Sequence, residues 1–479
     1  MTATTSMPLS MVLLLLGVVA TPLLCRILRR NAGFILAALY VLAAVVLMPA
    51  AREVMAGGHP TWSMPWLPSL GVSVSLRADG LGIVFTAIAL LVGAVVLVYA
   101  TRYLDPTDVE GRPLRHTGFY TVMAMFTLAM TGLVLADDLV WFFVCWEVTS
   151  IASFLLVGQA GRGGQLASLR TMFLTFVGGL TLLVAVGLIA ARTGTLTMSE
   201  ALGHSVWVTD PAFTAAVAVL VLTAGFTKSA QFPFHVWLPD AMAASTPVSA
   251  YLHAAAVVKA GIFLLLRFSA AFHATPIWNA LLICVGLFTA ALGAFFALQQ
   301  TDLKKLMAYS TVSQLGLVVS AIGVGTKVAV AAAVLHVVAH AMFKSGLFMM
   351  VGVVDHATGT RDMRSGPPLP PGGISVATST AEFPACMEKI GPLLRSTATD
   401  IASTTTKLIC HGPLPIPEMI RSPIPIPTVT PATNSNERRS RAPNDRPSET
   451  TAAIGAKNGA WCPITVVATH HANPAAKAH

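Results

Sequence analysis

The chain has 479 residues, of which 55% are hydrophobic and only 11% are charged. Soluble domains carry about 25% charged residues, so this composition excludes an ordinary soluble protein and indicates a membrane protein. The formal net charge of +9 could suggest nucleic acid, but the basic residues cluster between apolar runs, which favours a lipid bilayer and no nucleic acid. The six cysteines lack CxxC or metal-ligand spacing, so we expect neither a disulfide framework nor a zinc site.

Eleven runs approach the length of about 20 mostly apolar residues that a helical span needs. Each is expected to be a helix, because the hydrocarbon core offers no water to bond the backbone. The first run has no basic region before it, so we expect a retained span and no cleaved signal peptide. The predicted spans are 8–25, 32–51, 80–100, 117–135, 138–157, 171–190, 212–231, 248–268, 277–298, 306–325 and 328–353.

The Lys and Arg residues between these runs predict the orientation. With the N-terminus outside, twelve basic residues fall on the inner side and five on the outer side, as the positive-inside rule requires. The inner set is Arg26, Arg29, Arg30, Arg102, Arg112, Arg115, Arg162, Arg170, Lys304, Lys305, Arg361 and Arg364, and the outer set is Arg52, Arg77, Arg192, Arg267 and Lys327.

The composition changes after about residue 366. Residues 367–479 hold seventeen of the thirty prolines and no run that could span a membrane. Proline removes a backbone donor and clashes with the preceding helical turn, so PLPIPEMIRSPIPIP cannot be a helix. We therefore expect a disordered tail at 367–479.

Seven ionisable side chains lie inside the predicted spans, where a charged form costs at least about 2.5–3.5 kcal/mol unless it is paired or hydrated. Such groups usually face the protein interior and serve transport, although polar residues that tie helices together and snorkelling lysines are structural alternatives. Charges at the span ends are common and are expected to be structural: Asp137, Asp138, Lys304 and Lys305. The seven candidates for proton translocation are Glu147, Lys228, His253, Lys259, His336, His340 and Lys344.

Glu147 and Lys228 are the first two candidates along the chain. Glu147 lies in the middle of VWFFVCWEVTS and is too short to snorkel. Lys228 precedes Pro233 and Pro239, which should break the seventh span. A broken helix is tolerated where its free backbone groups line a cavity or meet water, so Lys228 could exchange a proton there. A carboxylate moving toward or away from it would change how tightly it holds that proton.

The other five candidates lie on two later spans. His253 and Lys259 are six residues apart, about 120° on an ideal helix, so they need not face one another. HVVAHAMFK places His336, His340 and Lys344 on one helix face, rising about 12 Å. The two histidines could hold a metal, but no acidic third ligand lies nearby, so we favour a proton relay and no metal.

Several segments between about 75 and 364 together resemble the proton-translocating antiporter family, which includes the large subunits of Mrp-type Na⁺/H⁺ antiporters and the antiporter-like subunits of respiratory complex I. The resemblance implies that Glu147 pairs with Lys228 on a broken helix and that Lys259 continues the path. It also implies that His336, His340 and Lys344 form the polar motif of span eleven. The segments are RADGLGIVF, the pair Trp146 and Glu147, TKSAQFPFHVWLPDAMAASTPVSAYLHAAAVVKAGIFLL, LKKLMAYSTVSQLG and HVVAHAMFKSGLFMMVGVVDHATGTRD.

Within this family, DHATGTRD and the opening spans look most like the A-type large subunit of the Mrp antiporter. That resemblance implies a multi-pass protein of the bacterial cell membrane, without a cofactor, in a hetero-oligomeric complex of antiporter subunits that exchanges cytoplasmic Na⁺ for external H⁺. The family fold has two inverted five-helix repeats, each with a broken helix. We therefore expect an all-α membrane protein with a three-helix segment at 1–116, a first repeat at 117–268, an incomplete second repeat at 277–364 and the tail.

The chain departs from the family after TRDMR, where a second broken helix with its own lysine should follow. A frameshifted or truncated reading frame explains this better than a natural short variant. An alternative function is the proton-pumping arm of complex I or a membrane-bound hydrogenase, with the redox centre on a partner, because the chain has no cysteine cluster or nucleotide fingerprint. A third hypothesis is that this product is inactive, because its second half-path is missing.

Overall fold

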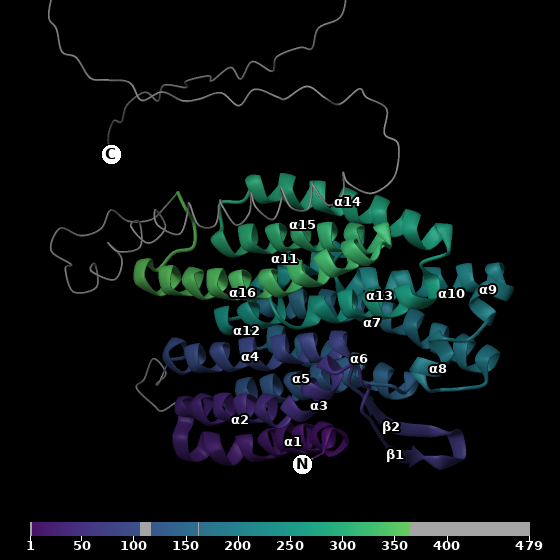
Figure 1. Cartoon of the computed structure of the whole chain (residues 1–479). Coiled ribbons are helices and arrows are strands. Elements are labelled where there is room, and N and C mark those ends of the chain that lie inside the picture. The colour runs from purple at the N-terminus through teal and green to yellow at the C-terminus, as the bar shows by residue number, and fades with distance from the viewer. Residues whose placement is uncertain (1, 106–115, 161, 365–479) are drawn as a thin grey trace, which may run out of the picture. The chain divides into compact units, whose positions relative to one another are not determined.

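The computed structural model describes residues 2–105, 116–160 and 162–364, and this part is almost entirely helical (Figure 1). The predicted tail at 367–479 lies outside the described residues, as do Arg112 and Arg115. The helices are α1 (Ala3–Leu28), α2 (Ala32–Val46), α3 (Met48–Met55), α4 (Gly80–Tyr103), α5 (Thr117–Leu135), α6 (Leu139–Gly158), α7 (Arg162–Thr193), α8 (Met198–Leu202), α9 (Val206–Thr209), α10 (Pro211–Lys228), α11 (Trp237–Asp240), α12 (Thr246–Leu252), α13 (Val257–Phe272), α14 (Pro276–Leu298), α15 (Leu303–Val324) and α16 (Lys327–Thr358).

Ten helical runs of the described residues are long and apolar enough to cross a membrane, which makes this a multi-span membrane protein. The first of them, Ala3–Met55, contains two crossings. It reverses at Arg29, and Ser10 then donates to the carbonyl of Ala43 at 3.1 Å, so α1 and α2 lie antiparallel. The ten runs therefore contain the eleven predicted spans.

Polar residues fix where the spans begin. The side chains of Asp79, Asp138 and Asp302 accept hydrogen bonds from the first backbone N–H groups of α4, α6 and α15. These groups have no partner within the helix, so a carboxylate cap both satisfies them and favours the positive end of the helix dipole. The predicted structural role of Asp138 at the end of a span is thus a helix cap.

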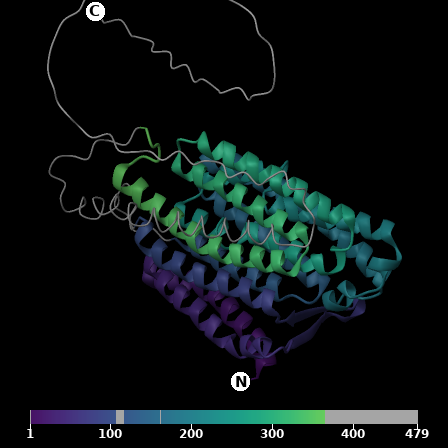
Figure 2. The ribbon, with the colours of Figure 1, turned by 45° about the horizontal axis from the view of Figure 1, so that its top comes forward.

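The long helices lie side by side, and Figure 2 shows them as nearly aligned rods. The run of α12 and α13 is central. In its most apolar stretch of 18 residues, 78% of the residues are buried, against 33% in the corresponding stretch of α14. Large apolar side chains are exposed on the outer helices, such as Leu16 on α1, Phe173 on α7 and Leu287 on α14. This distribution is typical of a bundle whose surface faces lipid, because apolar side chains are stable there.

Two spans are interrupted inside the bundle. α10 ends at Lys228, and the chain continues through Ala230, which has a φ of +53°, into short helical turns that end at Ala243. This confirms the predicted break of the seventh span. The eighth span is also interrupted, between Leu252 and Val257, where an unbroken helix was expected.

A β-hairpin follows α3 and was not anticipated from the sequence. Its strands β1 (Thr61–Leu67) and β2 (Val72–Arg77) pair antiparallel, with Thr61 opposite Arg77. Residues 61–67 are mostly exposed and contain Pro65, so they show neither strict alternation nor a long apolar run. The hairpin is tied to the bundle by Asp138, whose Oδ2 accepts from the Ser73 N–H at 3.2 Å.

Candidate functional site

Glu147 lies on α6 with its carboxylate against α7. Its Oε1 is buried and accepts no hydrogen bond from any residue that the structure describes. A Cβ added to Gly179 would overlap this oxygen. The carboxylate therefore occupies a space on α7 that exists because residue 179 has no side chain.

Lys228 is fully buried at the last position of α10 and binds α6. Its Nζ donates to the Trp146 carbonyl at 2.7 Å and to Ser150 Oγ at 2.9 Å. It also lies 4.3 Å from the centre of a Trp146 ring, which adds a cation–π contact. No ion pair within 4.0 Å joins Lys228 to Glu147 in the part of the chain that the structure describes, so the expected pairing is not present here as a direct bond.

The helix break beyond Lys228 is stabilised by side chains from the same segment. The indole N–H of Trp237 donates to the carbonyl of Thr227 at 2.9 Å, which satisfies a carbonyl freed by the break. Gln231 is buried, and its Nε2 donates to the Ser229 carbonyl at 2.9 Å. The end of α10 also packs tightly on α13, since a Cβ at Gly261 would lie 2.8 Å from the backbone N of Ser229.

Lys259 on α13 and His340 on α16 form a direct buried hydrogen bond. The Lys259 Nζ lies 2.9 Å from the His340 Nδ1, and both side chains are almost completely buried. An ammonium and an imidazolium are both pure donors, so this bond forms only when at least one of the two groups is neutral. The hydrogen-bonded pair can therefore carry at most one extra proton.

Lys344 continues the row one turn further along α16. Its buried Nζ donates to the hydroxyl of Ser310, and to the carbonyl of Met307 at 3.3 Å, both on α15. His336, one turn before His340, is half-buried, and its Nε2 has no partner among the described residues. Thus the predicted face of α16 points into the bundle. His340, in the middle of this face, contacts Lys259, and Lys344 contacts α15.

His253 stands apart from this row. It is fully buried at the interruption between α12 and α13, and neither ring nitrogen has a hydrogen-bond partner among the described residues. Its ring lies between the aromatic rings of Trp237 and Phe348, with centroids 6.3 and 6.0 Å away. The structure does not connect it to Lys259 by a hydrogen bond.

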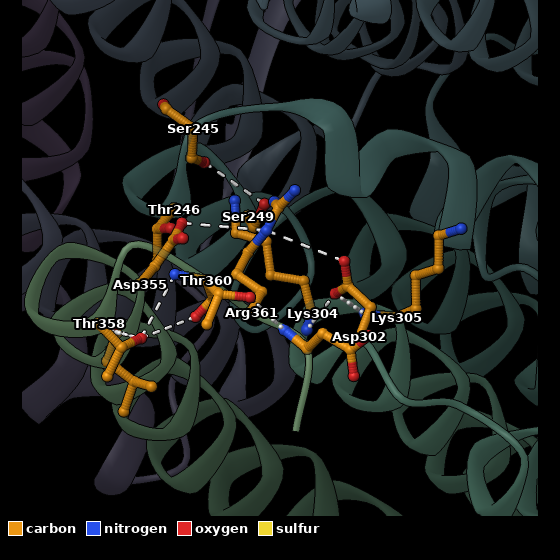
Figure 3. A network of polar contacts seen from close by, with 12 residues as sticks. Ser245, Thr246, Ser249, Asp302, Lys304, Lys305, Asp355, Thr358, Thr360 and Arg361 are labelled. Carbon is orange, nitrogen blue, oxygen red and sulfur yellow. Dashed lines mark hydrogen bonds and ion pairs between the residues drawn. The ribbon is translucent and has the colours of Figure 1, made fainter. Parts of the chain in front are cut away.

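Lys304 was expected at the membrane interface but is buried. Its Nζ donates to the Ala244 carbonyl at 2.8 Å, just before α12 begins. Figure 3 shows it among the charged groups where α12, α15 and α16 converge. The Arg361 Nε lies 3.8 Å from Asp302 and 4.0 Å from Asp355.

These groups line a polar pocket of about 540 Å³, which opens at this end of the bundle. Lys304, one of its lining residues, lies three and six residues before Met307 and Ser310, the two α15 partners of Lys344. The helical rise places Ser310 about 9 Å along the axis from Lys304. No charge pattern in the sequence signals this burial, because DLKKL looks like an ordinary helix start.

The family profile "NADH:quinone oxidoreductase/Mrp antiporter, TM" matches residues 136–369. The antiporter subunit mnhA2 of Staphylococcus aureus (strain MRSA252) is 40% identical over 355 residues, which cover 71% of this chain and 44% of that protein. The mnhA2 subunit of Staphylococcus haemolyticus (strain JCSC1435) is 38% identical over 363 residues, with 72% and 45% covered. The chain therefore spans less than half the length of these curated relatives.

Two solved structures share this arrangement of helices. A chain of the Mrp complex from Dietzia sp. DQ12-45-1b matches with a TM-score of 0.71 and 52% identity, over 76% of this chain and 39% of that one. A chain of the membrane-bound sulfane sulfur reductase, an archaeal respiratory membrane complex, matches with a TM-score of 0.66 and 25% identity, over 75% and 58%. The buried charges, the broken seventh span and these matches agree, and residues 136–369 of the chain match the membrane domain of the NADH:quinone oxidoreductase/Mrp antiporter family.

Proposed function

We propose that the chain is a membrane subunit of a multisubunit antiporter that exchanges monovalent cations, Na⁺ in particular, for protons. The observation that carries this proposal is the direct bond between Lys259 and His340, two titratable groups in the centre of the bundle. The antiporter names of the mnhA2 relatives and the Mrp complex match support it. Its partners would be the other subunits of that complex.

The proposed transfer step uses the single proton of the Lys259–His340 pair. The Lys259 ammonium donates its proton to the neutral Nδ1 of His340, which leaves a neutral amine and an imidazolium. A proton arriving at the amine would then require the imidazolium to pass its own proton onward. Histidine is suited to this role, because small changes in its surroundings switch its charge near neutral pH.

Lys344 and Lys304 would extend this row toward the polar pocket. Lys344 binds Ser310 on α15, and a hydroxyl both donates and accepts, so it can bridge two titratable groups. Lys304, on the same helix, lines the pocket. We infer that protons are exchanged with the aqueous phase through this pocket.

Glu147 and Lys228 would form the other part of the path. Lys228 binds a carbonyl and a hydroxyl, which hold its ammonium without taking the proton away. Glu147 is the nearest group on α6 that could accept it, from the position next to Trp146. Proton transfer at this site therefore requires Glu147 to move toward Lys228, or a water molecule between them.

The proposed location is a bacterial cell membrane, with the N-terminus outside. The twelve inner and five outer basic residues support this orientation. The polar pocket then faces the cytoplasm, since Arg361 and Lys304 belong to the inner set. Movement of one charge across 100 mV involves about 2.3 kcal/mol, which a proton relay can couple to Na⁺ exit.

Everted membrane vesicles test the proposed function. The full chain is produced with its partner subunits in cells that lack Na⁺ antiporters, and a pH-sensitive dye reports the proton gradient after Na⁺ is added. We expect Na⁺-dependent proton movement that Glu147→Gln abolishes. An assembled complex without such movement would overturn the proposal and favour an inactive product.

A redox-driven proton pump is the second candidate, because the archaeal respiratory complex also matches the fold and the family description includes NADH:quinone oxidoreductase. Purification of the chain from its native membrane separates the two functions. Co-purifying flavin or iron–sulfur subunits, with proton movement on electron-donor addition and none on Na⁺ addition, would establish the redox role.

A further inference from the structure

α7 carries two adjacent glycines at the point where it faces the Glu147–Lys228 site. A Cβ at Gly179 would overlap Glu147 Oε1, and a Cβ at Gly178 would overlap Thr227 Oγ1, next to Lys228. Glycine is a much weaker helix former than alanine, so two in succession need a packing reason. Here the reason is room for a carboxylate and for the end of the broken helix.

The space at Gly179 holds the Glu147 carboxylate by shape. The buried Oε1 has no hydrogen-bond donor among the residues described, although a buried carboxylate oxygen normally has one. Lys228 meanwhile uses the Trp146 carbonyl and Ser150 as its partners. The carboxylate and the ammonium are thus neighbours that are each held by something other than the opposite charge.

We propose that Gly179 is a positioning residue, which provides a notch on α7 that holds the Glu147 carboxylate away from Lys228. This inference rests on the proposed function and adds a mechanical element to it. With the notch open, Glu147 has two places for its carboxylate, against α7 and against Lys228. Any side chain at 179 removes the first place and drives the carboxylate toward the second.

The chain supplies a matched control on the same helix. Gly187 also lies within α7, but a Cβ there would meet nothing within 4 Å. Gly179→Ala and Gly187→Ala therefore make the same change in helix propensity, and only the first fills the notch. Glu147→Asp provides the rescue, because a side chain one methylene shorter withdraws the carboxylate from residue 179.

The experiment compares these variants in the full chain assembled with its partner subunits. We expect Gly179→Ala to lower Na⁺-dependent proton flux about tenfold or more, as small misplacements of a reacting group do. We expect Gly187→Ala to stay within about twofold of the wild type. Combining Gly179→Ala with Glu147→Asp should recover flux relative to Gly179→Ala alone.

The pH profile of flux separates positioning from simple damage. A carboxylate forced against Lys228 stabilises the ammonium, so Gly179→Ala should move the alkaline limb of the profile to higher pH. The double variant should return the limb toward the wild-type position. An unchanged limb, wild-type flux in Gly179→Ala, or no recovery in the double variant would each overturn the notch.

Thermal melting of the complex tests the notch independently of transport. Gly179→Ala should lower the melting temperature or the amount assembled, and Glu147→Asp should restore part of the loss, while the effects of Gly187→Ala and Glu147→Asp should simply add. Absence of coupling between 147 and 179 would refute the notch. The two proposals can also fail separately. If the variants show this coupling but the wild-type complex moves no protons when Na⁺ is added, the proposed function is overturned and the notch is supported.

Discussion

Replacement of His340 separates the structural role of the Lys259–His340 bond from its role in proton transfer. His340→Ala removes the acceptor and leaves the Lys259 ammonium buried without it. His340→Gln offers a carbonyl oxygen that can accept the same hydrogen bond but cannot carry a proton. We therefore expect both variants to lose Na⁺-dependent proton flux and only His340→Ala to lose stability.

The magnitude follows from the geometry of the bond. A hydrogen bond to a charged group contributes about 1.5–3 kcal/mol, and both partners here are buried, so the upper half of that range applies. For a chain of this length, about 2–3 kcal/mol lowers the melting temperature by roughly 3 °C. Melting of the purified complex and dye-based flux in vesicles measure the two quantities. Flux in His340→Gln above about a tenth of wild type would refute the relay, since general acid–base steps contribute about 10²–10⁴-fold.

Three further substitutions test other parts of the site. Ser150→Ala removes one of two acceptors of the Lys228 ammonium, so we expect the free energy of unfolding to fall by about 1.5–3 kcal/mol in melting experiments and flux to be reduced, not abolished. Lys304→Met keeps the buried stem but removes the proposed proton carrier that lines the pocket, so flux should fall about 10²-fold while assembly is kept. Burial alone would raise the pKa of Asp79, but the adjacent Arg267 guanidinium holds it below its usual range. The pair therefore stabilises the fold above about pH 4 and loses this contribution as the pH falls through the lowered pKa, a dependence that should be absent from melting curves of Asp79→Asn.

Much of the fold followed from hydrophobic length, because a span in lipid must satisfy its own backbone. Most runs of about 20 apolar residues could therefore be assigned as helices, although the ends of some differ by several residues and the eighth span is interrupted. Pro233 and Pro239 correctly placed the break after Lys228. The inward face of α16 followed from the i, i+4, i+8 spacing of its three titratable residues. A charged group in the middle of a span is unstable against lipid and therefore faces the bundle interior.

Other features depend on contacts that one sequence does not display. The interruption between Leu252 and Val257 contains only His253 and three alanines, which are compatible with an unbroken helix. The burial of Lys304 depends on the Ala244 carbonyl, sixty residues away. In the sequence, nothing distinguishes Gly179 from other small residues in an apolar run. Its contact with Glu147 is visible only in the structure. The repeat boundaries and the roles of the seven titratable residues stay predictions.

The two buried lysines differ in what they bind, and under the proposed function this difference indicates where proton movement would be controlled. Lys259 is bonded to a titratable partner and can exchange a proton without any rearrangement of the helices. Lys228 is bonded to a carbonyl and a hydroxyl, so exchange with Glu147 needs that carboxylate to leave its place on α7 or a water molecule to enter. The transfer that depends on movement therefore lies at the broken helix α10. Gly261 on α13 packs against Ser229 at this break, and α13 also carries Lys259. A shift of the end of α10 would therefore displace α13. In the proposed path, the break would thus control when a proton reaches the row of titratable residues on α16.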